Sequence, residues 1–115
     1  MTSVLSIATS GMAAAQKRLE VSARNVANVS ADLPTDAPPD VAAAFAALRA
    51  PLRMDQVEVS GGGTAPVVTQ APPGTQVDLA NEAIQLLVAR YTFAANAKVA
   101  KLAGEMQKSL LDIKT

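Results

Sequence analysis

The 115-residue chain contains no histidine, no cysteine and no tryptophan. Histidine and cysteine are the commonest general bases, nucleophiles and soft metal ligands, so the residues on which most catalytic and transition-metal sites are built are missing. The ten acidic residues are scattered and form no oxygen-ligand loop of the EF-hand type. We therefore predict that the protein is not an enzyme, with no catalytic or metal-binding residues and no cofactor.

Aromatic residues are also few, namely Phe45, Tyr91 and Phe93. Half of the residues are apolar, but many of these are alanines, which bury little area when a core forms. A core made by this chain alone would be thin. The composition therefore indicates that other chains complete the burial of its apolar surface.

The charge is balanced, with ten basic and ten acidic residues. No segment has the dense basic face of a nucleic-acid-binding protein, so we expect no nucleic-acid partner. No run of eighteen apolar residues exists, and we expect no direct membrane span. The first residues lack a basic stretch, and Thr9, Ser10 and Gly11 interrupt the apolar ones, so we expect no cleaved signal peptide.

The C-terminal third predicts one long helix. It contains no proline and one glycine, and Asp78 is placed to cap the first turn. Apolar residues recur there at helical spacing: Ile84, Val88, Tyr91, Ala95, Val99, Leu102, Met106, Leu110 and Ile113. Such a helix would be roughly 55 Å long, whereas a compact domain of this size would be about 30 Å across. The row of apolar residues along this helix can be covered only by another element of similar length.

Residues 3–29 predict a second long helix. Leu5, Met12, Leu19 and Val26 are spaced by seven, and Ala8, Ala15, Ser22 and Val29 each follow by three. This two-position heptad pattern is typical of a helix that pairs along a coiled-coil seam. The glycine at position 11 suggests a bend, and we interpret Asn25 and Asn28 as residues that cap the end of the helix.

The first part of the middle region is rich in proline. Residues 30–40 contain three prolines and three aspartates and predict a mobile linker. Residues 41–49 predict a short helix capped by Asp40. Pro51 would end this helix.

A β-hairpin is predicted after the short helix. Residues 52–60 and 65–70 have strand-like patterns, and Gly61–Gly63 supply the turn between them. The alternation of apolar residues changes phase near Asp55–Gln56, which suggests a bulge. An isolated hairpin is marginally stable in water, so this one should lean on the helices or on neighbouring subunits.

The sequence thus predicts a mainly α protein, in which long N- and C-terminal helices pair as a coiled-coil-like hairpin around a small β-hairpin and a proline-rich linker. Three segments form one structural unit: 1–29, 30–76 and 77–115. Two kinds of function fit this plan: a structural subunit that assembles through its terminal helices, and a small coiled-coil adaptor or chaperone-like binding module. The predicted assembly interface consists of Leu5, Ala8, Met12, Ala15, Leu19, Val26, Val29, Val88, Tyr91, Ala95, Val99, Leu102, Met106, Leu110 and Ile113.

Both ends of the chain carry short motifs that resemble one known family. The N-terminal pieces are Ser10-Gly11-Met12, Ala15, Leu19 and Arg24-Asn25-Val26-Ala27-Asn28-Val29. The C-terminal pieces are Val77-Asp78-Leu79-Ala80, Glu82, Ala95-Asn96-Ala97-Lys98-Val99, Glu105-Met106 and Leu110-Leu111-Asp112-Ile113. In this order and spacing they resemble the axial proteins of the bacterial flagellum, particularly the rod proteins of the basal body. Arg24 stands where the family commonly has asparagine, and the short middle resembles a short, proximal-type rod protein.

The resemblance implies a structural function. In this family the terminal helices pair and pack with those of neighbours into a helical tube, the rod, which crosses the periplasm and transmits motor torque for motility. The implied partners are copies of the same chain, other rod or axial proteins, and the flagellar type III export apparatus. The implied location is the basal body, reached without a cleaved signal peptide.

Overall fold

A computed structural model describes residues 2–29 and 36–113 of the protein. The elements, in chain order, are α1 (Thr2–Val29), α2 (Pro39–Arg49), β1 (Leu52–Glu58), β2 (Thr64–Gln70) and α3 (Leu79–Ile113). The molecule measures 75 × 25 × 17 Å and has a radius of gyration of 19.8 Å. A compact chain of this length would have a radius of gyration of about 13 Å, so the protein is a rod-shaped unit rather than a globule.

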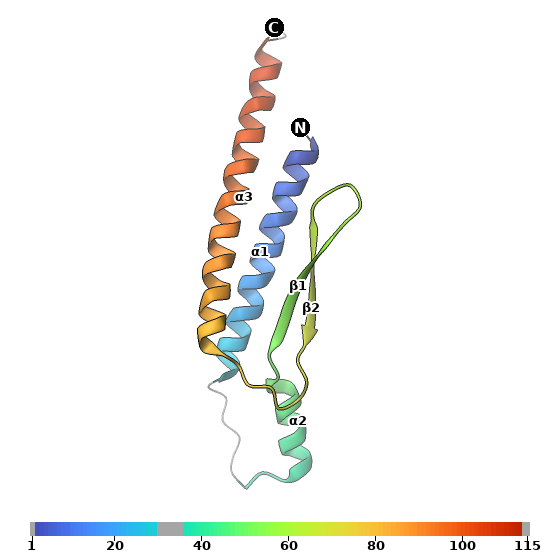
Figure 1. The fold of residues 1–115 in the computed structure, drawn as a ribbon, viewed down its shortest axis with the longest axis vertical. Helices are drawn as coiled ribbons and strands as arrows, with labels where there is room; N and C mark the ends of the chain where they lie inside the picture. Colours follow the sequence, from blue (N-terminus) through green and yellow to red (C-terminus); the bar gives the residue numbers. More distant parts are fainter. Residues whose placement is uncertain (1, 30–35, 114–115) are drawn as a thin grey trace.

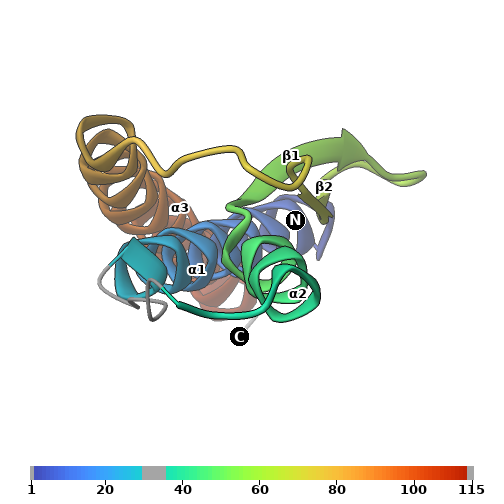
Figure 2. The same cartoon turned by 90° about the horizontal axis from the view of Figure 1, so that it is seen from below.

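The long terminal helices pack side by side and run in opposite directions, so that the start of α1 and the end of α3 lie at the same end of the molecule (Figure 1). The view along the long axis places α1 between α3 and the hairpin (Figure 2). Among the described helices and strands, α3 packs against α1 alone, whereas α1 also touches β1, β2 and α2. The predicted fold, with paired terminal helices and a small hairpin between them, is confirmed.

The hairpin has an unbroken antiparallel register, from Leu52 opposite Gln70 to Glu58 opposite Thr64. The predicted bulge is therefore wrong. The alternation of apolar residues changes phase at Val57, but this side chain is exposed, so the strand needs no bulge to bury it. The predicted turn is correct, since all three residues of Gly61–Gly63 have positive φ angles, which glycine adopts without strain.

The predicted short helix is present as α2, but Asp40 does not cap it. Pro38 occupies the N-cap position without a side-chain hydrogen bond, and the helix begins at Pro39, where the missing N–H costs nothing. Asp40 lies in the first turn, where a carboxylate suits the helix dipole. The predicted linker, residues 30–40, is therefore too long at its end, because Pro39 and Asp40 belong to α2. Residues 36–38 precede the helix, and residues 30–35 lie outside the described residues.

Side chains fix the ends of the helices. The Oδ1 atom of Asp78 accepts hydrogen bonds from the backbone N–H groups of Ala80 (3.0 Å) and Asn81 (3.2 Å), so the predicted cap of α3 is confirmed. Arg49 donates a hydrogen bond of 3.1 Å to the backbone carbonyl of Val29, which ties α2 to the end of α1. In the described part of the chain, none of the helices is both long and apolar enough to cross a membrane.

Gly11 has a role that the sequence did not suggest. It lies within α1, and a Cβ atom placed on it would come within 2.6 Å of both amide atoms of Asn96 in α3. The Asn96 amide in turn donates a hydrogen bond of 2.9 Å to the carbonyl of Thr92, which restricts its movement. The glycine therefore permits the close approach of the two helices.

The two glycines inside helices provide a matched test of this close approach. Nothing lies within 4 Å of a Cβ atom built on Gly104, so Gly104→Ala should stabilise the protein by about 0.5–1 kcal/mol through helix propensity. Gly11→Ala should lower stability, because the added methyl group displaces Asn96. Thermal unfolding followed by circular dichroism measures both. Equal stabilisation by the two substitutions would contradict the close contact at Gly11.

Candidate assembly interface

The surface on which α1 and α3 meet is made of small and polar side chains. The buried residues of α3 are Glu82, Ala89 and Ala103. Those of α1 are Ala8, Ala14, Ala15, Val21, Ser22 and Asn25. No leucine, isoleucine, methionine or aromatic residue is buried among the described residues, and the largest fully buried side chains are Asn25 and Ser22. The helices can approach closely because most of the side chains between them are small.

Asn25 joins three elements. It is 1 % exposed, and its amide nitrogen donates hydrogen bonds to the Leu52 carbonyl (2.8 Å) and to Oε1 of Glu82 (3.0 Å). Its Oδ1 atom accepts a hydrogen bond of 2.8 Å from the backbone N–H of Leu52. The prediction that Asn25 caps the end of a helix is therefore wrong. The side chain holds the start of β1 and the first turns of α3 against α1.

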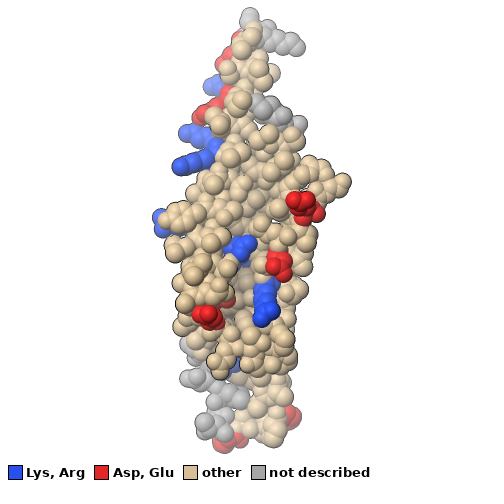
Figure 3. All heavy atoms as spheres, in the orientation of Figure 1, with Lys and Arg blue, Asp and Glu red and all other residues tan. Residues whose placement is uncertain are grey.

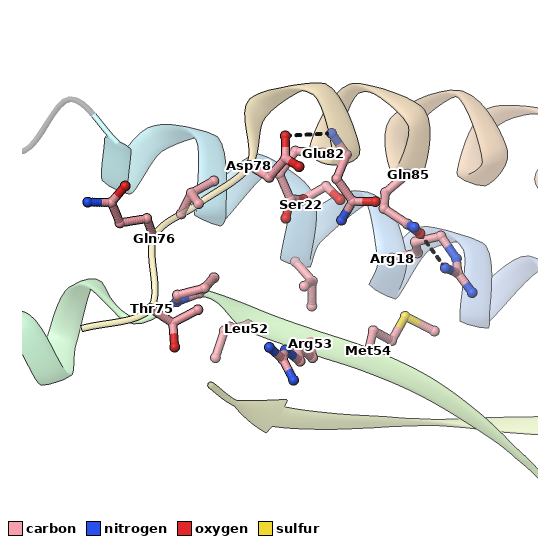
Figure 4. A pocket seen from close by; sticks show the side chains of 14 residues that line it. Arg18, Ser22, Leu52, Arg53, Met54, Thr75, Gln76, Asp78, Glu82 and Gln85 are labelled. Atoms are coloured by element: carbon pink, nitrogen blue, oxygen red, sulfur yellow. Dashed lines mark hydrogen bonds between the residues drawn. The ribbon is translucent and has the colours of Figure 1, made fainter. Parts of the chain in front are cut away.

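A polar cavity of about 320 Å³ lies beside this junction (Figure 4). Arg18 from α1 enters it and donates a hydrogen bond to Oε1 of Gln85 on α3. Arg53, Asp78 and Glu82 line the same cavity. Within residues 2–29 and 36–113, no three acidic side chains gather closely enough to hold a metal ion. The cavity lies where α1, β1 and α3 meet.

The predicted interface residues fall into two groups. Ala8 and Ala15 are buried against α3, and three others are half-buried: Leu5, Met12 and Val29. Leu19 and Val26 are exposed. All eight predicted residues of α3 are exposed: Val88, Tyr91, Ala95, Val99, Leu102, Met106, Leu110 and Ile113. Only the two alanines therefore belong to the buried seam of this chain, and most of the large side chains remain open to solvent.

The outward surface carries both charged and apolar groups. In Figure 3, charged side chains gather along the upper left edge, where α3 lies, and the rest of this face has separate charged groups within uncharged surface. An apolar groove of about 680 Å³ lies between α1 and α3. Its lining residues are Ala15, Gln16, Leu19, Ala83, Leu86, Leu87, Ala89, Arg90 and Phe93. Large exposed apolar surfaces of this kind mark interaction sites.

Comparison with known proteins identifies the N-terminal helix. Residues 5–32 match the model of a family described as flagella basal body rod protein. Over this segment, about a quarter of the chain, the protein is similar to flagella basal body rod proteins. No curated protein matches the chain. The predicted resemblance to rod proteins is confirmed, and the match that confirms it covers the N-terminal end.

The matched segment contains Gly11 and Asn25, which meet Asn96 and Glu82 of α3. Their partners, Asn96 and Glu82, belong to the C-terminal motifs that resemble the same family. The motifs at the two ends of the chain thus meet each other in the structure. Apolar periodicity could not reveal the roles of Asn25 and Glu82, because both residues are polar. Their presence in the motifs at the two ends of the chain was the signal that could have revealed these roles.

The junction at Asn25 predicts a loss of stability on truncation. Asn25→Ala leaves the N–H and C=O groups of Leu52 and the carboxylate of Glu82 without this partner, and each unsatisfied buried group costs about 1–3 kcal/mol. Denaturant titration should show a loss of at least about 2 kcal/mol. The matched control, Asn81→Ala, removes an exposed amide on α3 and should change stability by less than about 0.5 kcal/mol. Similar small losses for both variants would show that the junction does not hold the three elements together.

Proposed function

We propose that the protein is a structural subunit of the flagellar basal-body rod, which assembles through its terminal helices and transmits motor torque. One observation carries the proposal: the large apolar side chains of a rod-family chain point outward from a helix pair whose own seam is small and polar. A chain that pairs its helices in this way leaves its large apolar side chains exposed, so that neighbouring subunits can bury them.

The energetics favour assembly over a stable free monomer. Burying one leucine, isoleucine or methionine side chain contributes about 1.5–3 kcal/mol. Several such residues lie along α3, among them Leu102, Met106 and Leu110. Their combined burial offsets the loss of translational and side-chain freedom on association. Because the apolar residues follow the long axis of the molecule, neighbours that cover them would form long, stiff seams.

The family match indicates the flagellar basal body as the location. We further propose that the subunit lies in the part of the rod that crosses the periplasm, beside copies of itself and other rod or axial proteins. The flagellar type III apparatus would export it without a cleaved signal peptide. Rod proteins of this family are structural, and we propose no enzymatic activity for this chain.

A charge placed on the outward face tests the proposal. Leu19→Asp and Met106→Asp each put a carboxylate where a neighbour's apolar side chains would cover it, and burial of an unpaired charge is very costly. We expect both variants to be exported, to be absent from basal bodies and to abolish swimming in soft agar. Immunoblots of secreted and basal-body fractions separate failed export from failed assembly.

Lys17→Asp is the control on the same helix. It removes the exposed ion pair of 3.0 Å with Glu20, which contributes less than about 1 kcal/mol. This variant should assemble and swim almost normally. Normal basal bodies from both apolar-face variants would refute the proposed interface. A wild-type chain that forms a discrete dimer or trimer and never enters basal bodies would instead favour an adaptor or chaperone-like module.

A further inference from the structure

We propose that the outer edge of β1 is a docking site for an extended segment of a different protein, which adds to the hairpin as a third strand. The outer edge is the side of β1 that faces away from β2, and its available backbone groups belong to Met54, Gln56 and Glu58. The inference goes beyond the proposed rod function and is tested on the purified chain.

Hydrogen bonds at the two ends of the hairpin fix which backbone groups point outward. Ala71 donates a hydrogen bond of 2.9 Å to the carbonyl of Pro51, which lies opposite it. Val59 donates one of 3.2 Å to the carbonyl of Gly63. Hydrogen-bonded pairs alternate with non-hydrogen-bonded pairs along an antiparallel ladder. With the observed register, the N–H and C=O groups of the even-numbered residues of both strands therefore point away from the partner strand.

Two side chains from α1 already bond to such outward groups. The amide of Asn25 binds both the N–H and the C=O of Leu52, at 2.8 Å each, as the peptide group of a neighbouring strand would. The Oγ atom of Ser10 accepts a hydrogen bond of 3.2 Å from the N–H of Thr64. Both contacts agree with the outward direction of the even-numbered positions.

The outer edge of β2 is poorly suited to pairing. The N–H of Thr64 is used by Ser10, and Pro66, the next outward position, has no N–H to donate. The side chain of Gln70, at the other end, donates a hydrogen bond of 2.5 Å to the carbonyl of Ala47 and so ties this end to α2. Proline on an edge strand is a common means of preventing the addition of a further strand.

The outer edge of β1 is open beyond Leu52. In the described part of the chain, the outward N–H and C=O groups of Met54, Gln56 and Glu58 have no hydrogen-bond partner. Among the described elements, β1 packs against β2 and α1, and α3 does not cover it. Donors and acceptors that recur at every second residue of a strand match the backbone of an extended polypeptide, which binds by adding a strand.

The side chains of β1 indicate what such a segment would carry. Side chains directly opposite one another on neighbouring strands interact, and opposite charges stabilise the pair. An antiparallel partner would therefore place an acidic residue opposite Arg53 and basic residues opposite Asp55 and Glu58. Apolar residues would lie opposite Met54 and Val57.

A second copy of β1 does not meet these requirements. In a symmetric antiparallel pair of β1 edges that uses all three available positions, Glu58 of each copy would lie opposite Met54 of the other. Asp55 would lie opposite Val57 in the same pair. Each acidic side chain would thus face an apolar one, whereas a segment of a different protein can supply the complementary charges.

The probe for the test is an acetylated and amidated hexapeptide with the sequence Lys-Val-Thr-Lys-Val-Glu, which follows the pattern required of an antiparallel partner. Isotope-labelled full chain is titrated with it, and the backbone amides are followed by NMR. We expect saturable shifts of the amides of Met54, Gln56 and Glu58. N-methylation of the threonine and the second valine, whose N–H groups would face β1, should weaken binding by about tenfold or more. N-methylation of the first valine and the second lysine, whose N–H groups face away, should change it little.

Two proline variants test the same edge from the side of the protein. Gln56→Pro removes an outward N–H of β1 and leaves the ladder with β2 intact, so it should weaken peptide binding by about tenfold or more. Val68→Pro makes the matching change on the outer edge of β2 and should bind the peptide as the wild type does. Circular dichroism checks that both variants fold.

Equal binding of the two N-methylated peptides to the wild-type chain would overturn the inference, because backbone pairing would then contribute nothing. Absence of saturable binding, or shifts confined to the groove between α1 and α3, would overturn it as well. A wild-type dimer that Gln56→Pro dissociates would show that a second copy occupies the edge and would refute a different protein as the partner. None of these results depends on incorporation into basal bodies, so the inference can fail while the rod function stands.

Discussion

The close approach of α1 and α3 depends on side chains that are small or polar where the two helices meet. Gly11 admits the amide of Asn96, and Asn25 reaches across to Glu82. A pair of helices that approach this closely has no space for leucine or phenylalanine between them. Many of the large apolar residues consequently lie on the outside, where the described residues of the chain leave them exposed.

This arrangement separates two tasks that a globular protein combines in one core. Hydrogen bonds and shape specify how the chain folds on itself, and we propose that hydrophobic burial drives association. The hairpin contributes to the first task, since the start of β1 is held by Asn25 and its turn lies against Ile7 and Ser10 of α1. Thus α1 is the element on which the other elements of the fold are placed.

Much of the fold could be predicted from local signals. The periodic apolar residues predicted both long helices, Asp78 predicted the start of α3, and the three glycines predicted the turn of the hairpin. The seam was predicted only in part. Ala8, Ala15 and Ser22 lie in it, but the second heptad series in the seam contains Gly11 and Asn25, not Leu19 and Val26. Periodicity shows which residues share a face of a helix, but it does not show whether the covering surface comes from the same chain.

The central claim, that the outer apolar face is exposed in the subunit and covered in the assembly, can be measured by hydroxyl-radical footprinting. The free chain and purified basal bodies are oxidised under the same conditions, and side-chain modification is quantified by mass spectrometry. We expect Tyr91, Met106 and Leu110 to be modified readily in the free chain and protected in basal bodies, with Val21 weakly modified in both. Equal modification of these three residues in the two samples would contradict the account.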